Sequence, residues 1–137
     1  MLKAIVLSRV RAIVLTNVDY SVNRAIISIS SIDSEYPTFN KENGSIKDIL
    51  YLEFNDEEIG DTAMNDETAN KIAAFVKKNE NLVDQFVVHC DAGVSRSAGV
   101  CAAILKYLTN DDSPIFENPQ YCPNMNCYRK TLNALIS

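Results

Sequence analysis

The sequence predicts an α/β fold with a mainly parallel central sheet and helices on both of its faces. Short apolar runs rich in β-branched residues, typical of buried strands, alternate with longer segments of helical periodicity. The clearest unit is a strand over Gln85–Val88, a tight loop over 89–96, and a helix over 97–108 that is apolar on nearly every side. The length of 137 residues, with 47% hydrophobic and 23% charged residues, fits one domain over 1–137.

Three more strands are expected before this unit, at Lys3–Leu7, Ala25–Ile29 and Asp48–Phe54. Arg11–Thr16 is a near-copy of the first run and suits either a strand or a helix, because a short apolar run does not decide between them. Ser30–Gly44 is rich in Ser, Asp, Asn, Pro and Gly, which predicts a long surface loop.

Two aromatic residues, Tyr36 and Phe39, lie inside this loop. The loop would leave the carboxyl end of a strand, where ligands bind in open α/β sheets, so either ring is a candidate wall of a substrate pocket. We prefer the commoner alternative, in which the rings pack the loop onto the core.

Two amphipathic helices complete the predicted fold. The first begins near Asn65 or Asp66, either of which can cap it, and its expected core face consists of Ile72, Phe75 and Val76. The second follows a polar connection over 110–123 and is capped by Asn124. Its expected core face consists of Met125, Tyr128, Leu132, Leu135 and Ile136.

The loop between the central strand and helix carries the chemistry, and it reads His89-Cys90-Asp91-Ala92-Gly93-Val94-Ser95-Arg96-Ser97. The first N–H groups of a helix lack intrahelical partners and lie at the positive end of its dipole, so this junction favours a bound phosphate. Gly93 lets the backbone fold closely around an anion, and Arg96 offers a planar fork of donors. These surroundings stabilise a thiolate at Cys90, which predicts attack by sulfur on a bound phosphoryl group.

His-Cys, five residues and Arg-Ser resemble the signature loop of the cysteine-based protein tyrosine phosphatases, and its place in a short chain resembles the dual-specificity branch. The resemblance spans this loop, an acidic loop before it and the α/β order between them. It implies hydrolysis of phosphotyrosine through a phosphocysteine intermediate, without a metal or other cofactor. Phosphoserine and phosphothreonine are further candidate substrates. The resemblance makes Cys90 the nucleophile, and the backbone of Asp91 to Arg96 with the Arg96 side chain the holder of the phosphate oxygens.

A phosphatase of this kind needs a carboxylic acid on a neighbouring loop as proton donor. Leu52–Asp56 resembles the general-acid loop of dual-specificity phosphatases, so Asp56 is expected to protonate the leaving group and then to deprotonate the hydrolytic water. Glu57, Glu58 and Asp61 compete for this role, since an acidic loop is usually just solvated.

Three more residues of the signature loop receive roles. In the resembling family, the hydroxyl at the position of Ser97 helps the sulfur to leave, and the alternative is a serine that satisfies backbone at a helix start. His89 is expected to be structural, beneath the loop. Only the backbone of Asp91 is expected to bind the phosphate, because a carboxylate side chain beside a phosphate is unfavourable.

The four cysteines and single histidine favour neither a disulfide scaffold nor a zinc site. Cys101 is expected to be a small core residue on the central helix. Cys122 and Cys127 are candidate resolving thiols for an oxidised Cys90.

Composition also limits the location and partners. No apolar run approaches the ~20 residues of a membrane span, and residues 1–7 are too short for a secretory signal, so a cytoplasmic location is expected. The net charge of −5 argues against nucleic acid or an anionic membrane as partner, which leaves a phosphorylated protein or a small phosphomonoester as substrate.

Three alternatives remain open at this stage. An arsenate reductase-type redox enzyme would use a similar loop with resolving cysteines. A phosphate-binding module would keep the loop without turnover. A lipid or inositol phosphatase is less favoured, because such enzymes usually place lysines in the loop and none stands between Cys90 and Arg96.

Overall fold

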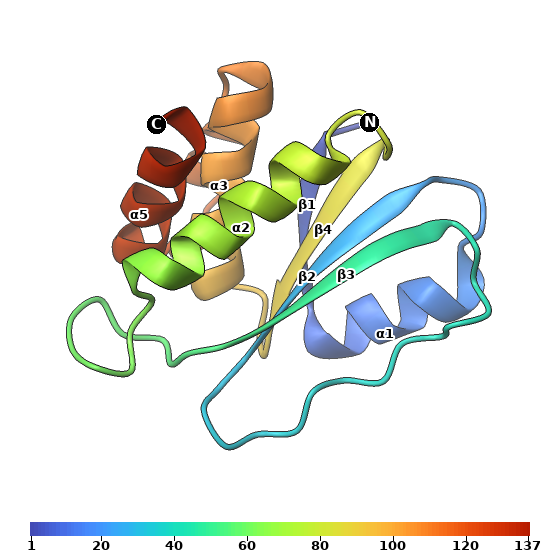
Figure 1. Cartoon of the computed structure of the whole chain (residues 1–137), viewed down its shortest axis with the longest axis horizontal. Helices are drawn as coiled ribbons and strands as arrows, with labels where there is room; N and C mark the ends of the chain where they lie inside the picture. Colours follow the sequence, from blue (N-terminus) through green and yellow to red (C-terminus); the bar gives the residue numbers. More distant parts are fainter.

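Four strands form one parallel sheet in the computed structural model, which describes all 137 residues (Figure 1). The strands are β1 (Ala4–Ser8), β2 (Arg24–Ser30), β3 (Ile46–Glu53) and β4 (Gln85–Cys90), and their order in the sheet is β1-β4-β2-β3. The strand that leads into the signature loop, β4, is therefore central, and its Val88 pairs with Val6 on one side and Ile27 on the other.

Helices cover both faces of this sheet, as the sequence predicts. They are α1 (Arg9–Val18), α2 (Asp66–Asn79), α3 (Arg96–Thr109), α4 (Ser113–Phe116) and α5 (Met125–Ile136). In Figure 1, α1 lies on one face, and α2, α3 and α5 lie on the other. No helix is both long and apolar enough to span a lipid bilayer.

The ambiguous near-copy at residues 11–16 is helical. Ser8 ends β1 and its Oγ accepts a hydrogen bond from the backbone N–H of Arg11 at 3.2 Å, which caps α1. The helix buries Ala12 against Ile26 and Val87, which face away from the other helices. Residues 11–16 are helical because this second apolar face of the sheet must be covered.

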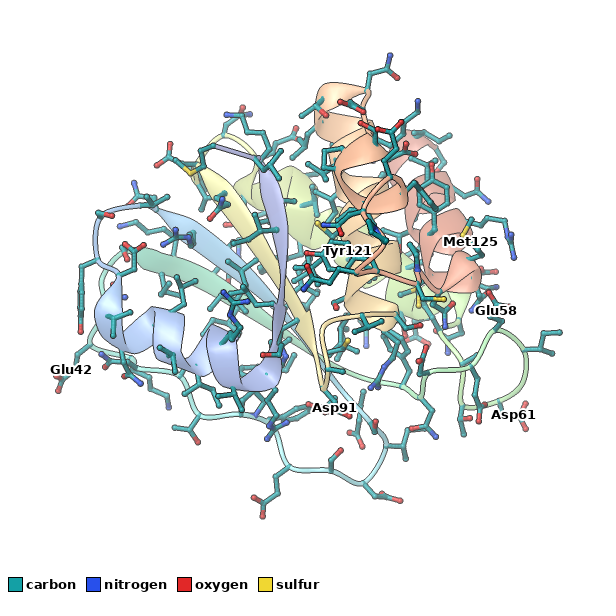
Figure 2. All side chains as sticks on the ribbon, turned by 180° about the vertical axis from the view of Figure 1, so that it is seen from behind. Glu42, Glu58, Asp61, Asp91, Tyr121 and Met125 are labelled. Atoms are coloured by element: carbon teal, nitrogen blue, oxygen red, sulfur yellow. The ribbon has the colours of Figure 1, made fainter.

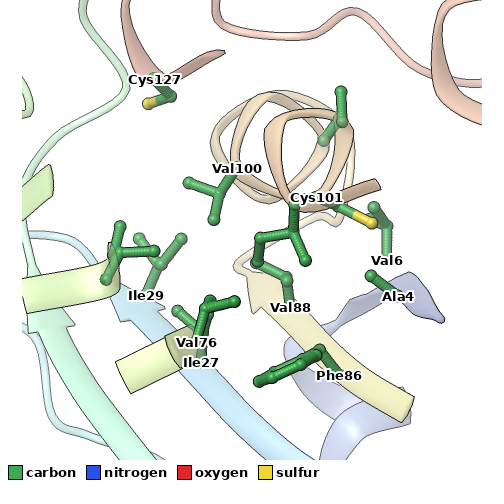
Figure 3. Packing of buried hydrophobic residues seen from close by; sticks show 14 of the residues in the cluster. Ala4, Val6, Ile27, Ile29, Val76, Phe86, Val88, Val100, Cys101 and Cys127 are labelled. Carbon is green, nitrogen blue, oxygen red and sulfur yellow. The ribbon is translucent and has the colours of Figure 1, made fainter. Parts of the chain in front are cut away.

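The larger core lies on the opposite face. Figure 3 shows strand residues there, including Ile27 and Val88, packed towards Val76 of α2 and Val100 of α3. All four are fully buried. Cys101 of α3 is also fully buried in this core, as expected, and the predicted core face of α2 is confirmed.

The predicted core face of the last helix is only partly confirmed, because Leu135 is buried and Tyr128 packs against the core, but the other predicted members are not buried. Its buried residues are Asn126, Cys127, Thr131 and Leu135, while Ile136 is 66% exposed. The reason is a close approach to α3 at Gly99, where an added Cβ would lie 2.4 Å from the carbonyl oxygen of Asn124. The buried Asn126 is satisfied because its Nδ2 donates to the carbonyl of Met64 at 3.1 Å.

The predicted surface loop is present, since residues 31–45 contain no helix or strand. Phe39 is 4% exposed and meets the ring of His89 edge-on, with 5.8 Å between the ring centroids. Phe39 therefore packs the loop onto the core, which is the alternative that we prefer from the sequence. Tyr36 is 46% exposed and rests against Tyr51.

Candidate active site

The signature loop lies between the end of β4 and the start of α3, at the carboxyl edge of the sheet. Gly93 has φ +73°, and an added Cβ there would lie 2.7 Å from the backbone nitrogen of Ser8. The backbone N–H of Arg9 donates to the carbonyl of Asp91 at 3.2 Å. The junction of β1 and α1 thus supports the loop from outside, and only glycine fits at position 93.

The backbone N–H groups of residues 91–95 donate no hydrogen bond to any protein acceptor. Carbonyls of the same loop do have partners, because Val94 accepts from the N–H of Cys122 and Ser95 from the N–H of Asn124, both at 3.0 Å. A run of free amides at the start of a helix is the arrangement that binds anions in proteins.

Arg96 is 5% exposed and fixed by three acceptors. Its Nη1 donates to the carbonyl of Phe54 at 2.8 Å and to Oγ of Ser31 at 3.1 Å, and its Nη2 donates to Oδ2 of Asp91 at 3.2 Å. Its Nε is buried and has no partner. A buried charged donor without an acceptor is costly, so this nitrogen is available to an anionic ligand.

Cys90 and Ser97 face one another across the loop. The Sγ of Cys90 lies 3.0 Å from the Oγ of Ser97, and both residues are buried. The hydroxyl of Ser97 is therefore placed to donate to a sulfur anion. Ser95, the residue before α3, makes no side-chain cap.

Asp56 is the acid that meets this loop. Its Oδ1 accepts from Oγ of Ser95 at 2.8 Å and from Nδ2 of Asn124 at 3.0 Å, while its Oδ2 has no protein partner. The competing Glu57 and Glu58 accept hydrogen bonds from Thr62 and from the backbone N–H of Met125, away from the loop. Figure 2 shows Glu58 and Asp61 well to one side of Asp91.

His89 lies beneath the loop and is fully buried. Burial lowers its pKa, so the ring is neutral. With a proton on Nδ1, it donates to the carbonyl of Cys90 at 3.2 Å, while Nε2 accepts from Oγ of Ser28 at 2.6 Å. These contacts suit the structural role expected for it.

All four cysteines are free thiols. Burial raises the pKa of Cys101, and it raises the pKa of Cys127 to about 12. Cys122 is exposed, with its backbone against Val94 of the loop. No group of three or more His, Cys, Asp or Glu side chains is arranged to hold a metal ion.

Sequence reasoning missed three contributions to the site. The Asp91 side chain was expected to play no part, but together with Ser31 it holds the guanidinium of Arg96. Asn124 was recognised only as a helix cap, yet its amide also holds Asp56. The signal available for Ser31 was its place directly after a strand, where ligand-binding residues gather in parallel sheets.

No protein-family model matches the chain, and no curated protein sequence does either. Solved structures do match. The human tyrosine phosphatase-like serine/threonine/tyrosine-interacting protein superposes with a TM-score of 0.68 at 17% identity, over 97% of this chain and 91% of that one. Human DUSP28 gives 0.65 at 17% identity, over 99% and 93%. OH1 from the Orf virus, a tyrosine phosphatase, gives 0.61 at 14% identity, over 96% and 81%. The chain therefore has the fold of the tyrosine and dual-specificity phosphatases.

Proposed function

We propose that this protein is a cysteine-dependent phosphatase that hydrolyses phosphotyrosine, and also phosphoserine or phosphothreonine, through a phosphocysteine intermediate. The observation that carries the proposal is the row of free N–H groups over residues 91–95, which directly follows Cys90 and leads into α3. The unpartnered Nε of Arg96 adds a charged donor at the same place. The fold shared with tyrosine and dual-specificity phosphatases supports the same activity.

In the first step, the loop amides and Arg96 hold the equatorial phosphate oxygens and neutralise their charge, so that no metal is needed. The Cys90 thiolate attacks phosphorus, and the bond from phosphorus to the ester oxygen breaks. Asp56 gives its proton to the departing oxygen, so that an alcohol or phenol leaves. The free Oδ2 is the oxygen available to carry this proton, because Oδ1 already accepts two hydrogen bonds.

In the second step, Asp56 takes a proton from a water that attacks the phosphocysteine. The bond between sulfur and phosphorus breaks, and the electron pair returns to sulfur. The hydroxyl of Ser97, 3.0 Å from the Cys90 sulfur, donates a hydrogen bond to the leaving thiolate. Inorganic phosphate then dissociates, and the enzyme regains its starting protonation when Asp56 carries the proton.

Hydrolysis of p-nitrophenyl phosphate in the presence of a chelator tests this mechanism. We expect turnover by the wild type, none by Cys90→Ser, and a rate lowered by ~10²–10⁴ in Asp56→Ala, the usual contribution of a positioned acid. Glu57→Gln is the matched control, because Glu57 adjoins Asp56 but bonds to Thr62 rather than to the loop. Normal activity of Cys90→Ser, or activity that requires a divalent metal, would contradict the proposal.

The redox alternative has one observation in its favour, since the segment that carries the exposed Cys122 hydrogen-bonds to the signature loop. Thioredoxin-dependent arsenate reduction that is lost in a Cys122/Cys127 double variant would support an arsenate reductase. We favour hydrolysis because Cys127 is buried and burial raises its pKa to about 12, which makes it a poor resolving thiolate.

A further inference from the structure

Exposed carboxylates flank the proposed phosphate site on two sides. They come from the loop after β2 with the end of β3, and from the loop that carries Asp56. We call this set the acidic rim, and its members are Asp33, Glu35, Glu53, Glu57, Glu58 and Asp61.

Hydrogen bonds hold the first half of the rim against the signature loop. Ser31 accepts from Arg96 at 3.1 Å and donates to Asp91 at 3.2 Å. Two residues later, the backbone N–H of Asp33 donates to Oε1 of Glu53 at 2.7 Å. This half therefore lies beside the beginning of the signature loop.

The second half of the rim lies at the other end of that loop. Asp56, which accepts from Ser95 at 2.8 Å, is followed directly by Glu57 and Glu58. Figure 2 shows Glu58 and Asp61 in this loop, to one side of Asp91. A phosphate bound between Cys90 and Arg96 would thus have carboxylates on both sides.

The charge of the rim is not neutralised within the protein. None of its six members takes part in an ion pair, because the five ion pairs of the structure involve other carboxylates. Two arginines lie at the site. Arg96 pairs with Asp91, and Arg9 donates to the backbone carbonyl of Glu35 at 2.7 Å rather than to a carboxylate.

The centre of the site has the opposite character. The buried, unpartnered Nε of Arg96 and the free amides of residues 91–95 call for one anion there. A second anionic group on the same ligand would meet the rim and be repelled, whereas a cationic group would be attracted.

We propose that the preferred substrates are phosphorylated protein segments in which Lys or Arg flank the phosphorylated residue. This inference rests on the proposed function and names the substrate class of that site. Charge complementarity of this kind chiefly raises the association rate and selects between partners. It disfavours substrates that carry several negative groups, such as inositol polyphosphates or peptides rich in Asp and Glu.

The test compares kcat/KM for three phosphotyrosine peptides of equal length, with Lys, Ser or Glu on both sides, and for p-nitrophenyl phosphate, which has no flanks. We expect the Lys peptide to exceed the Glu peptide by about tenfold or more, because several exposed charge contacts add up. The difference should shrink when the ionic strength rises towards 1 M, because salt screens exposed charges.

The triple variant Glu53→Gln/Glu57→Gln/Asp61→Asn should reduce this ratio. Glu42→Gln is the matched control and should leave it unchanged, because Glu42 is exposed and lies far from Asp91 in Figure 2. The salt dependence of the wild-type ratio tests the same point if the triple variant fails to fold.

Hydrolysis of p-nitrophenyl phosphate and of all three peptides without preference, or with a preference for the Glu peptide, would overturn this inference and leave the proposed function standing. Failure to hydrolyse any of these compounds would overturn the proposed function, and this inference with it.

Discussion

Replacing Asn124 tests whether one side chain both begins α5 and holds the proposed acid. Its Oδ1 accepts from the backbone N–H of Cys127, and its Nδ2 donates to Asp56 and to the carbonyl of Glu57, each at 3.0 Å. Asn124→Ala removes all three bonds. The lost cap and the lost bond to the carbonyl each cost about 1 kcal/mol, so the free energy of unfolding should fall by about 2 kcal/mol. Thermal unfolding should show a Tm lower by about 6–8 °C for a chain of this length.

Asn124→Asp separates the two roles of this residue. It keeps a good cap acceptor, so its stability loss should be smaller than that of Asn124→Ala. It also loses both amide donors and turns a carboxylate towards Asp56, so the acid is no longer held.

The kinetic assay for both variants is kcat/KM on phenyl phosphate and on p-nitrophenyl phosphate. We expect losses of about tenfold on phenyl phosphate and smaller losses on p-nitrophenyl phosphate, whose leaving group needs less protonation. Wild-type kinetics in Asn124→Asp, or equal losses on the two substrates, would refute the reasoning.

Three further predictions concern stability and thiol reactivity. Gly99→Ala places a methyl group 2.4 Å from the carbonyl oxygen of Asn124, so it should lower the free energy of unfolding by about 1–3 kcal/mol in denaturant titrations, and an unchanged midpoint would contradict the packing. Burial lowers the pKa of His89 from 6.5 in the folded protein, so His89 of the unfolded chain is protonated first as the pH falls. Because this protonation favours the unfolded chain, the free energy of unfolding should drop by up to about 1.4 kcal/mol per pH unit below pH 6.5. That drop between pH 6.5 and 5 should vanish in His89→Asn, which removes the only histidine of the chain. Iodoacetamide should label the exposed Cys122 in the native protein but leave Cys101, whose pKa is raised by full burial, unlabelled until the protein unfolds, as mass spectrometry of the labelled peptides would show.

Features that depend on neighbours in the chain were predictable. The β-branched run before Cys90 and the apolar run after Arg96 predict the central strand and helix, which the structure places at β4 and α3. The caps of α2 and α5 follow from the preference of asparagine for that position, and both Asn65 and Asn124 make the expected hydrogen bond. Periodicity also predicted the core face of α2, because its buried stripe is apolar.

Hydrophobic periodicity did not predict the polar residues that are buried on α5. The core side of α5 includes Asn126 and Thr131, which are buried with hydrogen-bond partners contributed by Met64. Those partners come from a distant part of the chain, so no local pattern indicates them. The near-copy at 11–16 likewise became a helix because the second face of the sheet needed a cover.

The sequence alone determined that a thiol and an arginine stand at the two ends of a loop entering a helix, because spacing along the chain is enough to say so. Only the tertiary structure decided what surrounds them. Ser31, Asp56 and Asn124 follow or precede different elements, yet they meet at one loop because parallel strands end at the same edge of the sheet. The acidic rim has the same origin. Asp33 and Glu35 follow β2, whereas Glu53 ends β3 and the other members follow it, and these neighbouring parallel strands end at the same edge of the sheet.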